Sequence, residues 1–295
     1  NVLLDGPPRR WDMADARFAA VAPLLHESVP REVSRPRAPP PVATARRDPA
    51  ATQTPLREVV PSDEALARTQ LLGNAGYREA AASAEGTPRP AYSVSLRANG
   101  AGWSRLGDVD VGRWRDDALR DAYGHFIYLR RAPGDTPASL TQHPAPDAEA
   151  QYRTRFLPDR VCFDATWPEW RTRCTVWVSP EDDVELRRVE LWNTSSRPLT
   201  LELMSAFEVD LSNARADEMH PAFASLFVSA AWDAATEALY LTRRPRRAGE
   251  PGQHAVQFMA QAETGGPLAV RVLADRARWL GRLREPWQPL AAFGA

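Results

Sequence analysis

Hydrophobic and polar residues alternate along many short runs from about residue 90 onward. In the run "RTRCTVWV" (171–178), one side of an extended strand carries Cys174, Val176 and Val178. Successive side chains of a strand point to opposite faces, so a period of two predicts a β-strand that is buried on one side. The run "LTLELMSAFEVDL" (199–211) shows the same pattern in its first half.

A further run, "VELRRVELWN" (184–193), is separated from 199–211 only by the polar segment "TSSRP". Two alternating runs joined by a short polar turn predict a β-hairpin. Further strands are expected at "YSVSL", "HFIYLR", "RVCFDA", "SLFVSAA", "ALYLT", "AVQFMAQA" and "LAVRVL". About a dozen strands with almost no helix between them predict an all-β fold of antiparallel sheets packed face to face.

The first 65 residues follow a different pattern. Residues 13–29 have apolar positions at helical spacing, which predicts a short helix disturbed by Pro23. Residues 30–55 are rich in proline, alanine and arginine, as is typical of an extended linker. The chain also begins with Asn1 rather than methionine, so we expect part of a longer protein. The expected organisation is a helical remnant of a preceding domain (1–32), a linker (33–65) and a C-terminally truncated β-domain (66–295).

The charge balance excludes some classes of partner. Basic and acidic residues number 37 and 38, and the formal net charge of -1 argues against a nucleic-acid-binding protein. All basic residues are arginine, which a GC-rich genome would favour, although planar guanidinium groups also suit hydroxyl, carboxylate and phosphate partners. No apolar run approaches the roughly 20 residues that span a bilayer, so no membrane span is expected.

Metal and cofactor signals are weak. The five histidines are scattered without metal-ligand spacing, and no glycine-rich phosphate loop precedes a helix. The acidic segment "PEDDVE" (180–185) favours a structural turn over a calcium site. Two cysteines, Cys162 and Cys174, predict buried reduced thiols on neighbouring strands. We therefore expect no cofactor and no metal.

The stretch "ANGAGWSRLGDVDVGRWR" (98–115) concentrates four glycines, two tryptophans and three arginines. Sugar rings present apolar C–H faces that stack on aromatic rings, while their hydroxyl groups need polar partners such as arginine and carboxylate. The stretch is therefore interpreted as a loop flanking strands, with chemistry suited to a carbohydrate. Trp177 and Trp192 lie inside regular strands, so we expect them to fill the core or a contact between layers.

Five motifs in order carry a resemblance to a known family. They are "LLGN" (71–74), "YSVSLRANGAGWSR" (92–105), "VGRWRDDALRDAYGHFIYLR" (111–130), "SPEDDVELRRVELWNTS" (179–195) and "MHPAFASLFV" (219–228). Over about residues 66–285 the chain resembles the N-terminal β-supersandwich domain of glycoside hydrolase family 94, which includes cellobiose and chitobiose phosphorylases. The corresponding region of the cyclic β-1,2-glucan synthases is particularly similar.

The resemblance implies a large antiparallel β-supersandwich without catalytic residues of its own. In the family, a following (α/α)6 barrel supplies the catalytic acid and inorganic phosphate is the nucleophile. The supersandwich packs on that barrel, supports the dimer of the phosphorylases and lends loops to the rim of the sugar site. The resemblance thus implies a carbohydrate-binding or scaffold domain that is inactive alone. The alternative is a purely architectural domain that packs against the barrel and never contacts sugar.

The resemblance also implies partners, a location and a candidate site. The implied partners are β-glucan or an oligosaccharide and the barrel, with a homodimer left open. The implied location is the cytoplasm or the cytoplasmic side of the bacterial inner membrane. At the loop edge facing the glucan or the barrel we expect Trp103, Arg105, Arg113, Trp114, Arg115 and Asp121. The chain departs from the family pattern there, because Trp103 and Leu106 stand where tyrosine and then tryptophan are common.

Overall fold

The computed structural model describes residues 57–61, 68–79, 90–116, 122–131, 135–220, 224–246, 249–261 and 270–289. The helix expected within residues 13–29 and the candidate residue Asp121 lie outside this set. Residues 57–59, in the expected linker, form a strand. The described strands pair antiparallel and form four sheets, so the predicted all-β class is confirmed.

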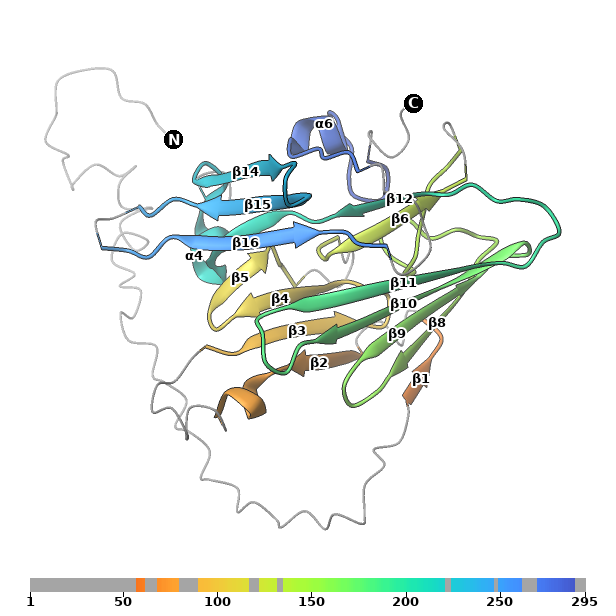
Figure 1. Cartoon of the computed structure of the whole chain (residues 1–295), viewed down its shortest axis with the longest axis horizontal. Helices are drawn as coiled ribbons and strands as arrows, with labels where there is room; N and C mark the ends of the chain where they lie inside the picture. Colours follow the sequence, from red (N-terminus) through yellow and green to blue (C-terminus); the bar gives the residue numbers. More distant parts are fainter. Residues whose placement is uncertain are drawn as a thin grey trace, which may run out of the picture. The chain divides into compact units, whose positions relative to one another are not determined.

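Two five-stranded sheets make up the sandwich (Figure 1). Sheet A has the order β1 (Arg57–Val59), β8 (Gln151–Phe156), β9 (Val161–Thr166), β10 (Trp170–Val178) and β11 (Glu185–Asn193). Sheet B has the order β13 (Val209–Asn213), β5 (Val109–Gly112), β4 (Gly102–Leu106), β3 (Tyr92–Arg97) and β2 (Thr69–Gly73).

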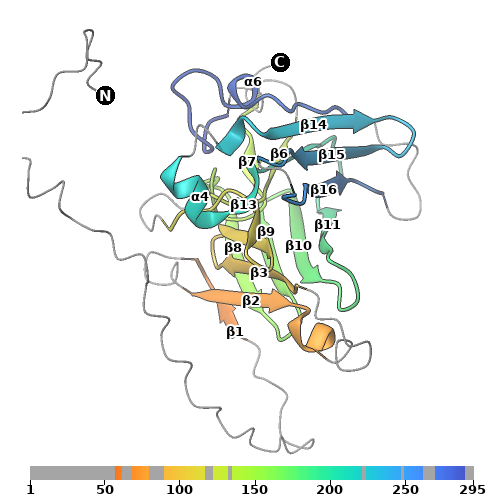
Figure 2. The same ribbon diagram turned by 90° about the vertical axis from the view of Figure 1, so that its left-hand side faces the viewer.

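Two smaller sheets and short helices complete the described part. Sheet C has the order β12 (Glu202–Ala206), β6 (Phe126–Arg130) and β7 (Ala138–Ser139). Sheet D has the order β14 (Val228–Asp233), β15 (Ala238–Arg243) and β16 (Gln253–Phe258), which lie together in Figure 2. The described helices are α4 (Ala214–Met219), α6 (Arg276–Leu280), one turn at residues 75–79 and the helical residues 224–225. None of the helices in the described ranges is both long enough and apolar enough to cross a membrane.

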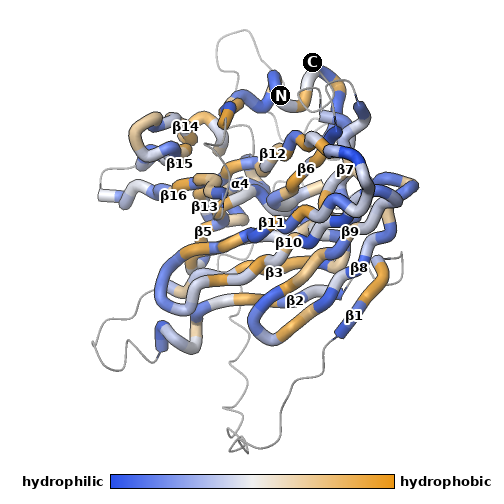
Figure 3. Tube along the Cα trace, turned by 45° about the vertical axis from the view of Figure 1, so that its right-hand side comes forward, coloured by the Kyte–Doolittle hydropathy of each residue, from blue (hydrophilic) through white to orange (hydrophobic). Residues whose placement is uncertain are grey.

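The main core lies between the inner faces of sheets A and B. Val94 and Leu96 on β3 pack in one cluster with Val161 on β9 and Val176 on β10, and all four are buried. Orange and blue segments alternate along many strands in Figure 3, as expected for strands with one buried side. The period of two in the sequence is therefore the cause of the sandwich, because every second side chain reaches the shared core.

Half of the glycine-rich stretch is strand, so its interpretation as a loop is wrong for β4 and β5. Only residues 98–100 and 107–108 are turns or bends. Gly100 has φ 94°, in the left-handed region that favours glycine, and Asn99 Oδ1 accepts a hydrogen bond from the Ala101 amide. The glycines thus let β3 turn tightly into β4 rather than forming an open loop.

The predicted hairpin of residues 184–193 and 199–211 is also wrong. Strand β11 pairs with β10, while 199–211 contains β12, which pairs with β6, and β13, which pairs with β5. Arg130 on β6 is buried, and its Nε donates to Glu202 of β12 at 2.5 Å. Alternation shows which face of a strand is buried but not which strand lies beside it, and here a buried charge needed its partner in sheet C.

Two smaller expectations are also settled. Residues 270–273, the described part of "LAVRVL", are not in a strand. Cys162 faces Thr175 across the ladder and Cys174 faces Phe163, so the two cysteines point to opposite sides of sheet A. Both are free and buried, as predicted.

Candidate functional site

Trp103 and Arg105 lie on the outer face of sheet B. They alternate with inward-facing residues of β4 and lie opposite Ser95 and Ser93 on β3. The guanidinium carbon of Arg105 is 4.2 Å from the centre of the Trp103 ring. Both residues are partly exposed. We call this group of Trp103, Arg105, Ser93 and Ser95 the Trp103 surface; it combines an indole, a cation and two hydroxyl groups.

Arg105 is held in place by a buried carboxylate of the neighbouring strand. Its Nε donates to Asp110 of β5, which is 1% exposed. Burial raises the pKa of Asp110, although the hydrogen bond and charge of Arg105 oppose that change. The pair therefore fixes the guanidinium beside the Trp103 ring.

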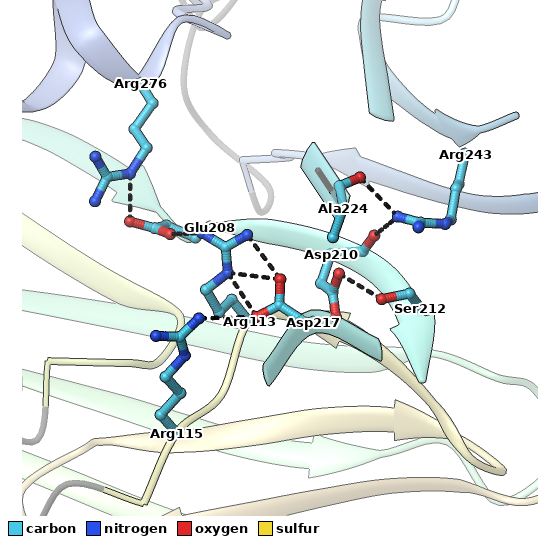
Figure 4. Close-up of polar contacts among 9 residues, drawn as sticks. All are labelled: Arg113, Arg115, Glu208, Asp210, Ser212, Asp217, Ala224, Arg243 and Arg276. Carbon is cyan, nitrogen blue, oxygen red and sulfur yellow. Dashed lines mark hydrogen bonds and ion pairs between the residues drawn. The ribbon is translucent and has the colours of Figure 1, made fainter. Parts of the chain in front are cut away.

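Arg113 lies at the centre of a cluster of ion pairs (Figure 4). Its Nε is 2.9 Å from Oδ2 of Asp217, its Nη2 is 2.8 Å from Oδ1 of that residue, and its Nη1 is 2.9 Å from Oε2 of Glu208. Burial alone would lower the pKa of Arg113, but the bonds to Asp217 raise it. The Arg113 side chain is only 12% exposed, so its donors serve these carboxylates.

Two further arginines share the same carboxylates. Arg115 Nη2 lies 3.5 Å from Asp217 Oδ2, and Arg276 Nε donates to Glu208 Oε1 at 2.7 Å. The cluster thus ties the segment after β5 to α4, to α6 and to the link between β12 and β13. Its carboxylates were not among the predicted residues. An N-cap signal, Asn213 with aspartate in the first helical turn, was present in the sequence and could have placed Asp217 on a helix.

Asp210 extends this cluster into the interior. Ser212 Oγ donates to its Oδ1 at 2.7 Å, and within the described ranges its Oδ2 has no hydrogen-bond partner. Burial is the main cause of the raised pKa of Asp210, and the neighbouring Asp217 adds to it. Arg243 Nη1 donates to the carbonyl groups of Asp210 and Ala224, at 3.2 and 3.0 Å. The Asp210 carboxyl is inaccessible to a sugar.

Trp114 packs inward rather than beside Trp103. It contacts the second core cluster, which includes Phe126 and Tyr128, and Arg97 lies over its ring at 5.2 Å. The structure thus brings Trp103 to Arg105, joins Arg113 to Arg115 through Asp217, and places Trp114 against the core. Which of these predicted residues contacts sugar stays a prediction.

A separate polar network lies between the sheets. Arg187 Nε donates to Glu185 at 2.5 Å, Ser104 Oγ also donates to Glu185, and Arg187 Nη1 donates to the His125 carbonyl at 2.6 Å. Burial opposes the charge on Glu185, but Arg187 and the other neighbours lower its pKa overall. His125 Nε2 lies 2.6 Å from Ser205 Oγ. The network satisfies charges that would otherwise be costly between two sheets.

Acidification is expected to destabilise the fold through His125. Burial and then the Arg187 cation lower the pKa of His125 to about 3, from an ordinary 6.5. The stability that depends on a neutral His125 is fully present above pH 6.5. It is lost as the pH falls toward 3, because the unfolded chain takes up the proton first. The full shift corresponds to roughly 5 kcal/mol. Because part of the residue reaches solvent, we expect the free energy of unfolding to fall by only about 2 kcal/mol through His125 between pH 7 and pH 4.

The measurement compares the free energy of unfolding of the wild type and of His125→Gln at both pH values. The wild type should lose about 2 kcal/mol more than the variant, because only the wild type carries the titrating imidazole. Equal losses would show that His125 does not titrate in this range.

Two small hollows open on the described surface. One, of about 190 Å³, is lined by Asp164, Thr166, Arg171, Thr172, Arg173 and Trp192. The other, of about 210 Å³, lies between β13 and sheet D and includes Arg243, Arg244 and Gln253. No group of three histidine, cysteine or acidic residues in the described ranges could hold a metal ion.

Comparisons with known proteins identify the fold. The family model described as "Glycosyl hydrolase 94, supersandwich domain" matches residues 88–294. The chain is 29% identical over 284 residues to the cyclic beta-(1,2)-glucan synthase NdvB of Rhizobium meliloti (strain 1021), covering 96% of this chain and 10% of the synthase. It is 25% identical over 134 residues to the N,N'-diacetylchitobiose phosphorylase of Vibrio proteolyticus, covering 44% of this chain and 17% of the phosphorylase.

The chain spans only a small part of each of these relatives, and the part it shares with the family model is the β-sandwich described above. The predicted family and the predicted supersandwich are confirmed by this match. The chain therefore belongs to glycosyl hydrolase family 94, as a supersandwich domain related to a glucan synthase.

Proposed function

We propose that this chain is the non-catalytic, carbohydrate-handling domain of an enzyme that processes β-glucan. The observation that carries the proposal is the likeness to a cyclic glucan synthase along 96% of the chain. The Trp103 surface supports it, because the indole offers a stacking platform and Arg105 and the two serines offer hydrogen bonds to sugar hydroxyl groups. The ligand in this proposal is a β-glucan or an oligosaccharide.

Three buried carboxylates near the Trp103 surface and the Arg113 cluster support a non-catalytic role. Cleavage of a glycosidic bond needs acidic groups that flank the bond within an accessible site. Asp110, Asp210 and Asp217 are all buried, and each is bound by an arginine or a serine. We place the catalytic chemistry in the (α/α)6 barrel that family membership implies, and expect this chain alone to cleave no glucan. The barrel, a second copy of the chain and a cytoplasmic location belong to the same proposal.

A second candidate function is purely architectural. Arg113 donates its hydrogen bonds to Asp217 and Glu208, and Trp114 packs against the second core cluster. Neither side chain then needs a sugar to explain its position. In this candidate the Trp103 surface packs against the barrel and never meets the glucan.

Replacing Trp103 with alanine separates the two candidates. Wild-type tryptophan fluorescence should be quenched saturably by linear β-1,2-glucooligosaccharides and not by cellooligosaccharides. Trp103→Ala should reduce the amplitude of that quenching because the stacking platform is gone. Its circular dichroism should stay that of a folded chain, because Trp103 lies on the outer face of sheet B.

The matched control is Trp232→Ala, which removes a tryptophan that is 39% exposed on sheet D. This control should keep the quenching that involves Trp103. A folded wild type without any quenching would favour the architectural candidate. Loss of the folded signal in Trp103→Ala would instead show that Trp103 is a structural residue.

A further inference from the structure

The outer face of sheet A carries a second group of polar and aromatic side chains. In the ladder, Arg171 on β10 pairs with Thr166 on β9 on one side and with Trp192 on β11 on the other. The adjacent row contains Asp164 on β9 and Arg173 on β10. Because alternate residues of a strand share a face, all five side chains project away from the core.

These residues surround the hollow of about 190 Å³, which we call the Trp192 hollow. Arg173 Nε donates to Asp164 Oδ1 at 2.6 Å, and Arg155 Nε donates to Oδ2 at 3.0 Å. The carboxylate is thereby fixed between two strands with lone pairs still available. The hollow is built on regular strands, which position side chains more rigidly than loops do.

Arg171 differs from the other arginines of this face. Its guanidinium carbon lies 4.8 Å from the centre of the Trp192 ring, and in the described part of the chain it has no carboxylate partner. By contrast, Arg188 on β11 pairs with Glu190 at 3.1 Å. An arginine that only stabilised the sheet would be expected to pair in the same way. The donors of Arg171 thus remain available at the edge of the hollow.

The mixture of charges selects the class of ligand. An anion would meet the Asp164 carboxylate, and a cation would meet the guanidinium groups of Arg171 and Arg173. A neutral sugar needs both donors and acceptors for its hydroxyl groups and an apolar wall for its C–H face. Asp164, Thr166 and Arg171 offer the donors and acceptors, and Trp192 offers the apolar wall.

We propose that the Trp192 hollow is an accessory saccharide-binding site, which takes a pyranose unit of a glucan chain. It rests on the proposed function in the choice of glucan, but uses none of the residues of the Trp103 surface. The inner faces of sheets A and B share one core, so the two outer faces point away from each other. A glucan segment on one face therefore does not occupy the other.

Calorimetric titration of the full chain with linear β-1,2-glucooligosaccharides tests the site. The wild type should bind at two sites, and Trp192→Ala and Arg171→Gln should each lose one of them or weaken it by at least about tenfold. Trp103→Ala should keep the site on sheet A. The matched control is Arg188→Gln, because Arg188 lies exposed on the same outer face and outside the hollow. This control should bind like the wild type.

The other outcomes separate the two proposals. If both hollow variants bind like the wild type while Trp103→Ala loses binding, the accessory site is overturned and the proposed function stands. If the folded wild type binds no glucan, both are overturned. Inorganic phosphate should not compete; competition would overturn the assignment to a neutral sugar. If Trp192→Ala fails to fold by circular dichroism, Arg171→Gln alone decides, because its side chain is exposed.

Discussion

Asp217→Ala is expected to lower the free energy of unfolding by about 3–5 kcal/mol, because it leaves a buried cation without its main partner. Arg113 makes three hydrogen bonds to this carboxylate, and the Asp217 side chain is 4% exposed. Glu208 would remain as a partner of Arg113 but is itself shared with Arg276. Urea unfolding followed by circular dichroism measures the change.

The matched control is Glu58→Ala. This residue pairs with Arg153 at 2.7 Å, but the two side chains are 43% and 58% exposed. Exposed ion pairs contribute about 0–1 kcal/mol, so the control should stay close to the wild type. If Asp217→Ala cost no more than Glu58→Ala, the cluster would not stabilise the fold, and its arginines would be available for another role.

Gly102→Ala is expected to cost about 3 kcal/mol, at the upper end of the range for overpacked cores. A Cβ at this position would lie 2.0 Å from the carbonyl oxygen of Ser95 on the paired strand. That atom is backbone, so relief requires β3 and β4 to separate. Thermal and urea unfolding of the variant measure the loss.

Gly76→Ala is the control for this substitution, because among the described residues no atom outside its own turn of helix lies within 4 Å of its Cβ position. Gly76 lies in the helical turn 75–79, where alanine is favoured over glycine by up to about 1 kcal/mol. The control should therefore be as stable as the wild type or more so. A fully stable Gly102→Ala would mean that β4 does not lie as close to β3 as described.

The strands were predictable from sequence because burial on one side imposes a period of two. "YSVSL" lies in β3, where buried and partly exposed residues alternate as expected, and "ALYLT" became part of β15. The neighbours of the strands were not predictable in the same way. Residues 199–211 supply strands to two different sheets, and the choice depends on contacts such as Arg130 with Glu202, far apart in sequence.

The candidate site was predictable in part. The composition of residues 98–115 drew attention to a surface where Trp103 and Arg105 lie together. It could not show that Arg113 would form ion pairs with Asp217 and Glu208, which lie about a hundred positions further along the chain. Nor did it indicate the Trp192 hollow, because Trp192 was expected in the core or in a contact between layers. Only strand register brings Asp164, Arg173 and Trp192 together.

Strand β11 has consequences for handling the protein. It is nine residues long and has one described neighbour, β10, so one side of its backbone is available for pairing with another chain. Leu191 on this strand is 43% exposed, while Arg188 and Glu190 place charges on the opposite face of the strand. Charged side chains at such an edge oppose its pairing with other copies of the chain. Salt that screens these charges should therefore make the protein in concentrated stocks more prone to aggregate through the free edge of β11.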